Sequence, residues 1–203
     1  ATTRDLIDAI RHRPSLRRLC GWESLGEVPS ESTFSRAFSA FARDGRPQHI
    51  HETLIKTHYG EKIAGHISRD ATAIRAREKA TLKPALPPQP KRGKRGRPRK
   101  DAPPTPPPEP TRLQLQLDRD LEANLFDLPK ACDWGCKKNS QSKKESWRGY
   151  KLHLDVIDGD IPISAVLTSA SLHDSQLAIP LAQMSATRII NLYDLADAAY
   201  DAK

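Results

Sequence analysis

The sequence predicts a mixed α+β protein, in which an N-terminal helical domain precedes a sheet domain that a proline-rich basic segment interrupts. Apolar residues recur at helical spacing in residues 1–60, whereas residues 146–203 show strand-like alternation around one helix. Between them, 11 of the 17 prolines lie in residues 84–110. The expected divisions are therefore 1–60, 61–78, 79–145 and 146–203, and the second of these holds the first strand of the sheet.

Residues 1–60 are expected to form a small helical domain. Its clearest helix is "VPSESTFSRAFSAFARDG", which Ser30 starts and Gly45 ends. The helix carries an apolar stripe, typical of a core, made of Phe34, Ala37, Phe38 and Phe41. The domain is either a structural bundle or a helix-turn-helix-like DNA-binding head with Arg36 and Arg43 facing outward.

The stretch "GHISRDATAI", Gly65–Ile74, predicts a buried strand that contains one carboxylate, Asp70. A carboxylate that is desolvated in a strand is destabilising unless a cation meets it. We therefore expect Asp70 to have a cationic partner.

Residues 79–145 are expected to be a disordered, extended linker for most of their length, because a proline-rich segment cannot bury enough apolar surface to fold. The formal net charge of the chain is +8, and Lys91–Lys100 alone holds seven Lys or Arg residues and no acid. A basic segment on a nearly neutral body predicts a polyanionic partner, most often nucleic acid.

Within this tract, Arg95-Gly96-Arg97-Pro98 has the core of an AT-hook, whose arginines enter the narrow minor groove of A·T-rich DNA. The expected DNA-binding residues are Arg92, Lys94, Arg95, Gly96, Arg97, Pro98, Arg99 and Lys100. A merely solvated basic linker or a localisation tract is the alternative, and attraction to phosphates without sequence preference holds in either case.

The rest of residues 79–145 is expected to hold one short helix over 113–128 and then a loop. Three cysteines, an odd number, argue against a disulfide framework. Cys132 and Cys136 lack the paired spacing of zinc sites, so ordinary thiols are expected. No apolar run approaches the roughly 20 residues that cross a bilayer, so no membrane association is expected.

Residues 146–203 predict a hairpin, a helix and a final strand. "WRGYKLHLDVI" alternates, "DGD" at Asp158–Asp160 signals a turn, and a returning strand follows. The helix is expected to start at Ser171, with Asp174 completing a capping box. The last strand, "RIINLYDLADAAYD", is apolar on both sides like a buried central strand and ends near Asp197.

Asp70 and Asp197 are the candidate site residues. Strands far apart in sequence can lie side by side in a mixed sheet, and these two would then present neighbouring carboxylates. Paired carboxylates bind hard divalent cations such as Mg²⁺ or Mn²⁺, which can activate an in-line phosphoryl displacement. Asp158, Asp160 and Asp174 are interpreted instead as turn or cap residues.

Five blocks of the chain resemble the DDE transposases of bacterial insertion sequences, in the broad group that includes the type-four and type-five elements. In chain order they are "LRRLCGWESLGEVPSESTFSRAFSAFA", "HISRDATAI", "CKKNSQSKKESWRGYKLHLDV", "LTSASLHDSQLAIPL" and "LADAAYDA". The last has Ala198-Ala199 where a Lys-Gly pair is commoner in the family.

The resemblance implies an incomplete RNase H-like catalytic domain, with Asp70 as the first catalytic, metal-binding acid and Asp197 as the second. It implies Mg²⁺-dependent DNA cleavage and strand transfer, terminal inverted repeats as the double-stranded DNA partner, a homodimer in the DNA complex, and a bacterial cytoplasmic, nucleoid-associated location. The third acid, a glutamate, is expected beyond Lys203, so the chain is interpreted as an N-terminal fragment or a truncated gene product that cleaves DNA poorly or not at all.

Two other functions remain open. The chain could be a non-catalytic DNA-binding protein derived from a transposase, or a hydrolytic nuclease that uses the same acids.

Overall fold

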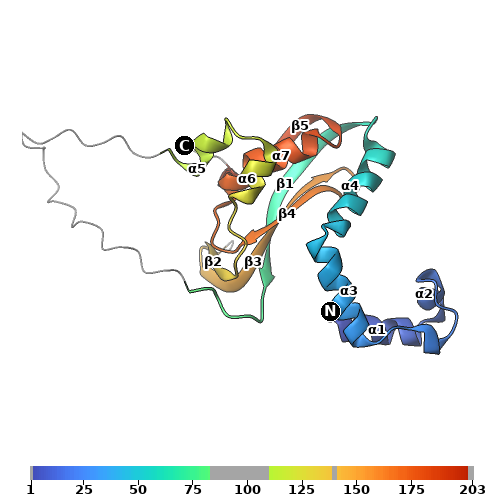
Figure 1. Ribbon diagram of the computed structural model, residues 1–203. Helices are drawn as coiled ribbons and strands as arrows, with labels where there is room; N and C mark the ends of the chain where they lie inside the picture. Colours follow the sequence, from blue (N-terminus) through green and yellow to red (C-terminus); the bar gives the residue numbers. More distant parts are fainter. Residues whose placement is uncertain (1, 83–109, 139–140, 201–203) are drawn as a thin grey trace, which may run out of the picture. The chain divides into compact units, whose positions relative to one another are not determined.

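The computed structural model describes residues 2–82, 110–138 and 141–200. The chain divides into two compact units, residues 1–57 and 58–203. The first is helical and the second contains a mixed sheet, so the expected α+β class is confirmed (Figure 1). Within the described residues, no helix combines the length and apolar character that crossing a bilayer requires.

The N-terminal unit consists of short helices, and side chains cap the starts of two of them. Its helices are α1 (Thr3–His12), α2 (Pro14–Leu19), α3 (Glu31–Arg43) and α4 (Arg46–Tyr59), with a 3₁₀ turn η1 (Leu25–Glu27). Thr2 and Asp5 form a capping box on α1. The Ser30 hydroxyl accepts from the Thr33 N–H at the start of α3, as the sequence predicts.

The expected core stripe of α3 is largely wrong. The core of this unit is Ile7, Ile10 and Val28, against which Leu16, Trp22 and Phe34 pack. Phe38 and Phe41 remain 43% and 39% exposed. Helical spacing identifies the apolar face of a helix, but it does not say how much of that face another element covers.

The second unit is built on five strands, β1 (Ile63–Arg75), β2 (Asp133–Lys138), β3 (Lys144–Ile157), β4 (Ile161–Ser169) and β5 (Ile190–Ala196). β3 pairs antiparallel with β1 on one side and with β4 on the other, while β5 lies parallel to β1. The spatial order is therefore β4-β3-β1-β5, and β2 pairs antiparallel with the first half of β3. The turn expected at Asp158–Asp160 joins β3 to β4, with Gly159 at φ +82°.

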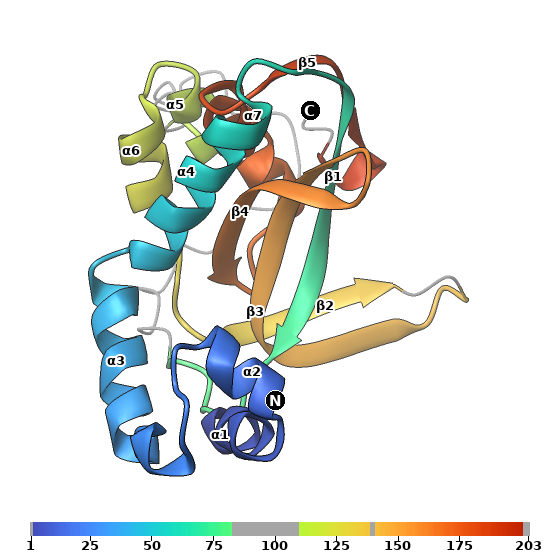
Figure 2. The ribbon, with the colours of Figure 1, turned by 90° about the vertical axis from the view of Figure 1, so that its right-hand side faces the viewer.

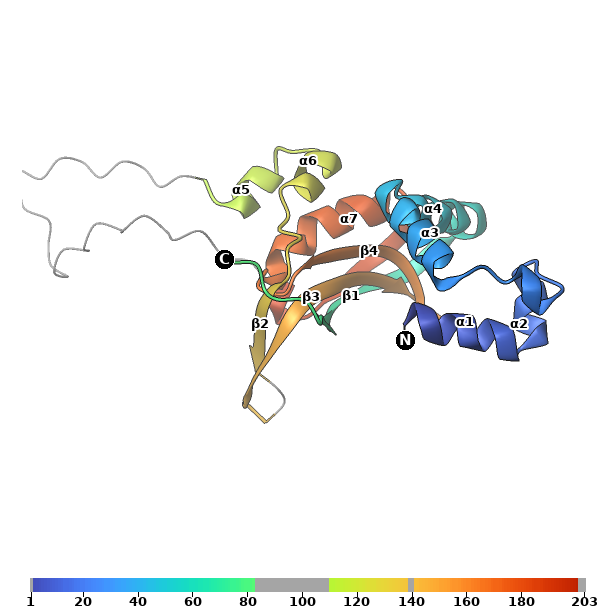
Figure 3. The ribbon, with the colours of Figure 1, turned by 60° about the horizontal axis from the view of Figure 1, so that its bottom comes forward.

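Helices cover one face of this sheet. α7 (Ala178–Ala186) lies over it, and the short helices α5 (Arg112–Gln116) and α6 (Leu121–Phe126) lie on the same side (Figure 3). The larger core cluster fills the space between helices and sheet, and its buried members are Leu128, Val166, Leu172, Leu177, Leu181, Met184 and Tyr200. Burial of these side chains is the main driving force for this layer.

Three expected elements differ from the structure. The sequence predicts a single helix over 113–128, but the structure has two short helices there, α5 and α6. The loop expected after it contains β2 and the start of β3. The helical segment after β4 begins as a 3₁₀ turn, η2 (Asp174–Leu177), whose cap is His173 rather than Ser171. A polar hairpin such as β2–β3 has no apolar alternation, which is why the sequence pattern suggested a loop.

The last strand is also misplaced by the sequence argument. β5 pairs with β1 alone among the described strands, so it is an edge strand and not a central one. Its apolar side chains are exposed, with Leu192 at 63% and Leu195 at 51%. An apolar composition on both faces indicates that a strand could be buried. Whether it is buried depends on the strands and helices that pack around it.

Candidate metal site and charged cluster

The buried charge of β1 is Arg69, and it has a matched partner. Its Nε and Nη2 donate to the two carboxylate oxygens of Asp155 in β3, each at 2.8 Å. Asp155 is fully buried and also accepts from the Ser185 hydroxyl of α7 at 2.7 Å. Burial opposes the charged form of Arg69, but the hydrogen bonds and charge of Asp155, with the charge of Asp194, raise its pKa overall.

Asp70, by contrast, is exposed. Successive residues of a strand face opposite sides of the sheet, so when Arg69 faces α7 its neighbour Asp70 faces away from it. The expectation that Asp70 is a buried carboxylate in need of a cation is therefore wrong. The buried charge that needs a partner is instead the adjacent residue, Arg69, which pairs with Asp155.

The strand register places Asp70 and Asp197 side by side in sequence terms, because each directly follows one member of the last paired position of β1 and β5. β1 and β5 run parallel, and their paired positions end with Arg69 opposite Ala196. The next residues along the two strands are Asp70 and Asp197. Asp70 Oδ1 accepts from the N–H of Ala71 at 2.6 Å, and Asp197 Oδ1 accepts from that of Ala199 at 3.0 Å.

These two hydrogen bonds leave most of the acceptor capacity of both carboxylates unused, since each oxygen has two lone pairs. Asp197 is exposed like Asp70 and opens the 3₁₀ turn η3 (Ala198–Tyr200). Among the residues that the structure describes, neither carboxylate forms an ion pair. Within the same described ranges, no group of three or more His, Cys, Asp or Glu side chains is arranged to hold a metal ion.

A polar cluster that the sequence analysis did not single out lies on the α7 side of β3. Lys151 Nζ bonds to Asp174 Oδ1 at 2.8 Å, and His153 is fully buried, with the Thr168 hydroxyl 3.0 Å from its Nε2. Burial, only partly offset by the charge of Asp174, lowers the pKa of His153 to about 4. The histidine is therefore neutral near pH 7.

The charge of Asp70 influences the pKa values of two members of this cluster, His153 and Tyr200. Burial and then the charges of Asp174 and Asp70 raise the pKa of Tyr200, whose hydroxyl lies 3.4 Å from His153 Nδ1. The sequence did contain a signal for this cluster, because Lys151, His153 and Asp155 alternate with the apolar residues of "YKLHLDV". Alternation places the apolar residues on one face and the polar residues on the other, and the structure buries the polar face under α7.

A hollow of about 230 Å³ lies on the α7 side of the sheet, and neither Asp70 nor Asp197 is in its lining. Its lining includes Ala71, next to Asp70, and Ala199, two residues after Asp197, as well as Lys151 and Asp174. A concave surface with several polar groups is the usual setting for a binding site.

Among the described residues, neither Cys132 nor Cys136 belongs to a group of side chains that could hold a metal ion. Cys132 is buried, and burial raises its thiol pKa, while Cys136 is exposed on β2. His173 caps η2, and Asp174, which was expected to complete a capping box with Ser171, is instead the ion-pair partner of Lys151. The predicted DNA-binding residues, Arg92 to Lys100, lie outside the described residues.

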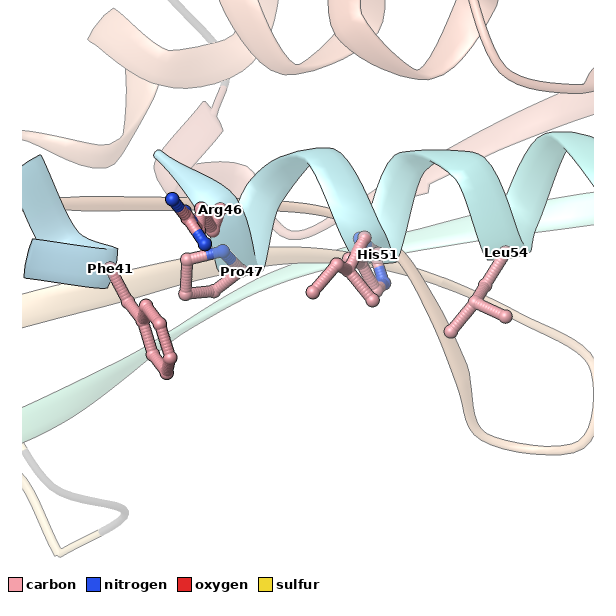
Figure 4. Close-up of a pocket in the computed structure, with 6 residues that line it drawn as sticks. Phe41, Arg46, Pro47, His51 and Leu54 are labelled. Atoms are coloured by element: carbon pink, nitrogen blue, oxygen red, sulfur yellow. The ribbon is translucent and has the colours of Figure 1, made fainter. Parts of the chain in front are cut away.

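The N-terminal unit has a separate apolar hollow of about 480 Å³ along the end of α3 and the start of α4 (Figure 4). Its lining residues are Phe41, Arg46, Pro47, Ile50, His51 and Leu54. The Arg46 guanidinium lies over the Phe41 ring, 5.6 Å from its centroid. The hollow has no acidic side chain in its lining, so it is not a candidate for the metal site.

No family model, curated protein or solved structure matches this chain.

Proposed function

We propose that this chain has the function of a DDE transposase, which cleaves and joins DNA with the help of Mg²⁺ or Mn²⁺. The single observation that carries the proposal is the parallel register of β1 and β5, in which Asp70 and Asp197 are the next residues in line. Two exposed carboxylates, one in β1 and one directly after β5, that pair with no cation among the described residues are suited to a shared metal ion.

The sheet topology supports an RNase H-like interpretation of this unit. Three antiparallel strands in the order β4-β3-β1 are followed by a helix and a strand parallel to β1. The five sequence blocks that resemble transposases include both aspartates. The likeness and the topology are independent of each other, because the first compares residue identities and the second compares strand pairing.

The residues present fit a magnesium ion. Mg²⁺ is often bound by one or two carboxylates together with waters and substrate phosphates, so Asp70 and Asp197 are sufficient protein ligands for weak binding. When bound, the ion would lower the pKa of a water or hydroxyl and stabilise the charge on the phosphate under attack. The protein would orient the two carboxylates, because the Ala71 N–H donates to Asp70 Oδ1 and the Ala199 N–H donates to Asp197 Oδ1.

The test measures the affinity of the whole chain for Mn²⁺, and electron paramagnetic resonance of the ion reports its binding. We expect weak binding that is at least roughly tenfold weaker in Asp70→Asn and in Asp197→Asn, since each change removes one charged ligand. Asp158→Asn, in the β3–β4 turn, is the matched control and should leave the affinity unchanged. Equal affinity in all four proteins would contradict the proposal.

A second candidate, a non-catalytic DNA-binding protein, is favoured by the basic tract at Lys91–Lys100. This second function predicts that the affinity for DNA does not depend on Mg²⁺ and is unchanged in Asp70→Asn and in Asp197→Asn. The transposase proposal predicts that Mg²⁺ strengthens binding to terminal inverted repeats in the wild-type chain only. Joined strand-transfer products would separate a transposase from a hydrolytic nuclease.

A further inference from the structure

We propose that the two-stranded ribbon formed by β2 and the first half of β3 is a contact surface for duplex DNA. The ribbon pairs Asp133–Lys138 with Lys144–Gly149 and projects beyond the rest of the sheet of this unit (Figures 2 and 3). The surface is separate from Asp70 and Asp197. It rests on the proposed function only for the choice of DNA as partner.

The two faces of the ribbon differ sharply in burial. Trp147 on the inner face is 5% exposed and lies against Gly135, where an added Cβ would come within 2.6 Å of the indole ring. Trp134 on the outer face is 59% exposed. The inner tryptophan thus fixes the base of the ribbon, and the outer one is left as an accessible aromatic surface.

The charges also separate by face. Lys137 on the inner face is opposite Glu145, which in turn pairs with Arg75 at 2.9 Å. On the outer face Lys138 is directly opposite Lys144, and both are exposed. Like charges directly opposite each other destabilise a strand pair. The outer face therefore carries unfavourable repulsion that a bound polyanion would relieve.

Duplex DNA fits this surface better than other polyanions. The major groove is about 12 Å wide and admits a two-stranded ribbon, while the deep, narrow major groove of duplex RNA does not. Lys138 and Lys144 would contact phosphates on the groove wall. Trp134, near the base of the same face, would lie against the sugar-phosphate backbone and exclude water there.

The experiment measures affinity for a fluorescent DNA duplex over a range of salt concentrations, with the full chain. We expect K138Q/K144Q to reduce the slope of log K against log [salt] by about 2, since each lost phosphate contact removes about 0.9. The control K130Q/K137Q makes the same charge change away from the outer face and should reduce the slope by less than about 1. Equal reductions in the two proteins would overturn the proposal.

Two further readouts distinguish binding from structure. K138Q/K144Q should unfold at the same or slightly higher denaturant concentration, because it removes repulsion, so weaker binding would not reflect misfolding. DNA should quench tryptophan fluorescence in the wild type and much less in Trp134→Phe. Undiminished quenching in that variant, or equal affinity for duplex RNA, would rule out this face as a DNA surface.

The outcome is independent of the metal site. If the ribbon variants fail to change binding while the aspartate variants still lose Mn²⁺, only the ribbon inference is wrong. If Mn²⁺ binding is insensitive to Asp70 and Asp197 while the ribbon variants weaken DNA binding, the proposed chemistry is wrong and the ribbon stands.

Discussion

The pair Arg69–Asp155 is the residue-scale feature on which the sheet depends most. Asp155→Ala would leave a buried guanidinium without its carboxylate, which destabilises a fold by about 3–5 kcal/mol. Denaturant unfolding monitored by circular dichroism measures the loss. The double variant Arg69→Met/Asp155→Leu should recover most of the stability, because it removes both charges. A loss below about 1 kcal/mol in Asp155→Ala would contradict the assigned role.

His153 should make the stability depend on pH. Its pKa of about 4 in the fold lies below the ordinary 6.5, so the unfolded chain takes up the proton first as pH falls. The stability that the neutral histidine contributes is complete above pH 6.5 and is lost between pH 6.5 and about 4, by up to about 3 kcal/mol. His153→Gln cannot be protonated and should show a shallower loss over that window in unfolding curves at each pH. Parallel pH profiles for the two proteins would contradict this.

The residue scale also shows where sequence reasoning about the site succeeded and failed. The positions of Asp70 in β1 and of Asp197 directly after β5 were predictable, because strand signals and a family likeness locate residues along the chain. Which face each residue takes was not. A shift of one position exchanges the faces of a strand, and "SRDAT" offers a charged residue to both.

At the scale of elements, Gly149 is required where β3 passes from pairing with β2 to pairing with β4. It is opposite both Asp133 and Arg75, at φ +148°, and an added Cβ would overlap the Ile74 carbonyl oxygen. We expect Gly149→Ala to lower the free energy of unfolding by about 3 kcal/mol, because a backbone atom cannot move aside as a side chain can. Gly65→Ala in β1 is the matched control, since its Cβ would have only an ordinary contact with Asp158 at 3.5 Å. A similar effect of the two substitutions would contradict the geometric argument.

Elements were predictable where a periodic pattern met a clear turn. β3, the Asp158–Asp160 turn and β4 follow from alternation and turn residues alone. β2 and β5 were misjudged for opposite reasons. The polar residues Cys136–Lys138 and Lys144–Ser146 pair through their backbones, which side-chain patterns do not report. The apolar β5 lies at an edge because burial depends on what surrounds a strand.

At the scale of the whole molecule, the excess of positive charge is concentrated in one tract and not spread over the folded units. Removing Lys91–Lys100 takes away seven cations and leaves a formal net charge of +1. Because affinity for DNA at low salt comes mainly from released counterions, we expect the deleted chain to lose most of its salt-dependent binding, with a slope smaller by roughly 4–6.

The deletion also separates the tract from the ribbon. Circular dichroism should still report the described strands and helices, since none of them includes the tract. The binding that remains should still fall in K138Q/K144Q, because those lysines belong to a folded ribbon that the deletion leaves intact. If the deleted chain kept the full salt slope, the tract would not be the electrostatic contact, and the folded surface would have to supply the affinity despite its small net charge.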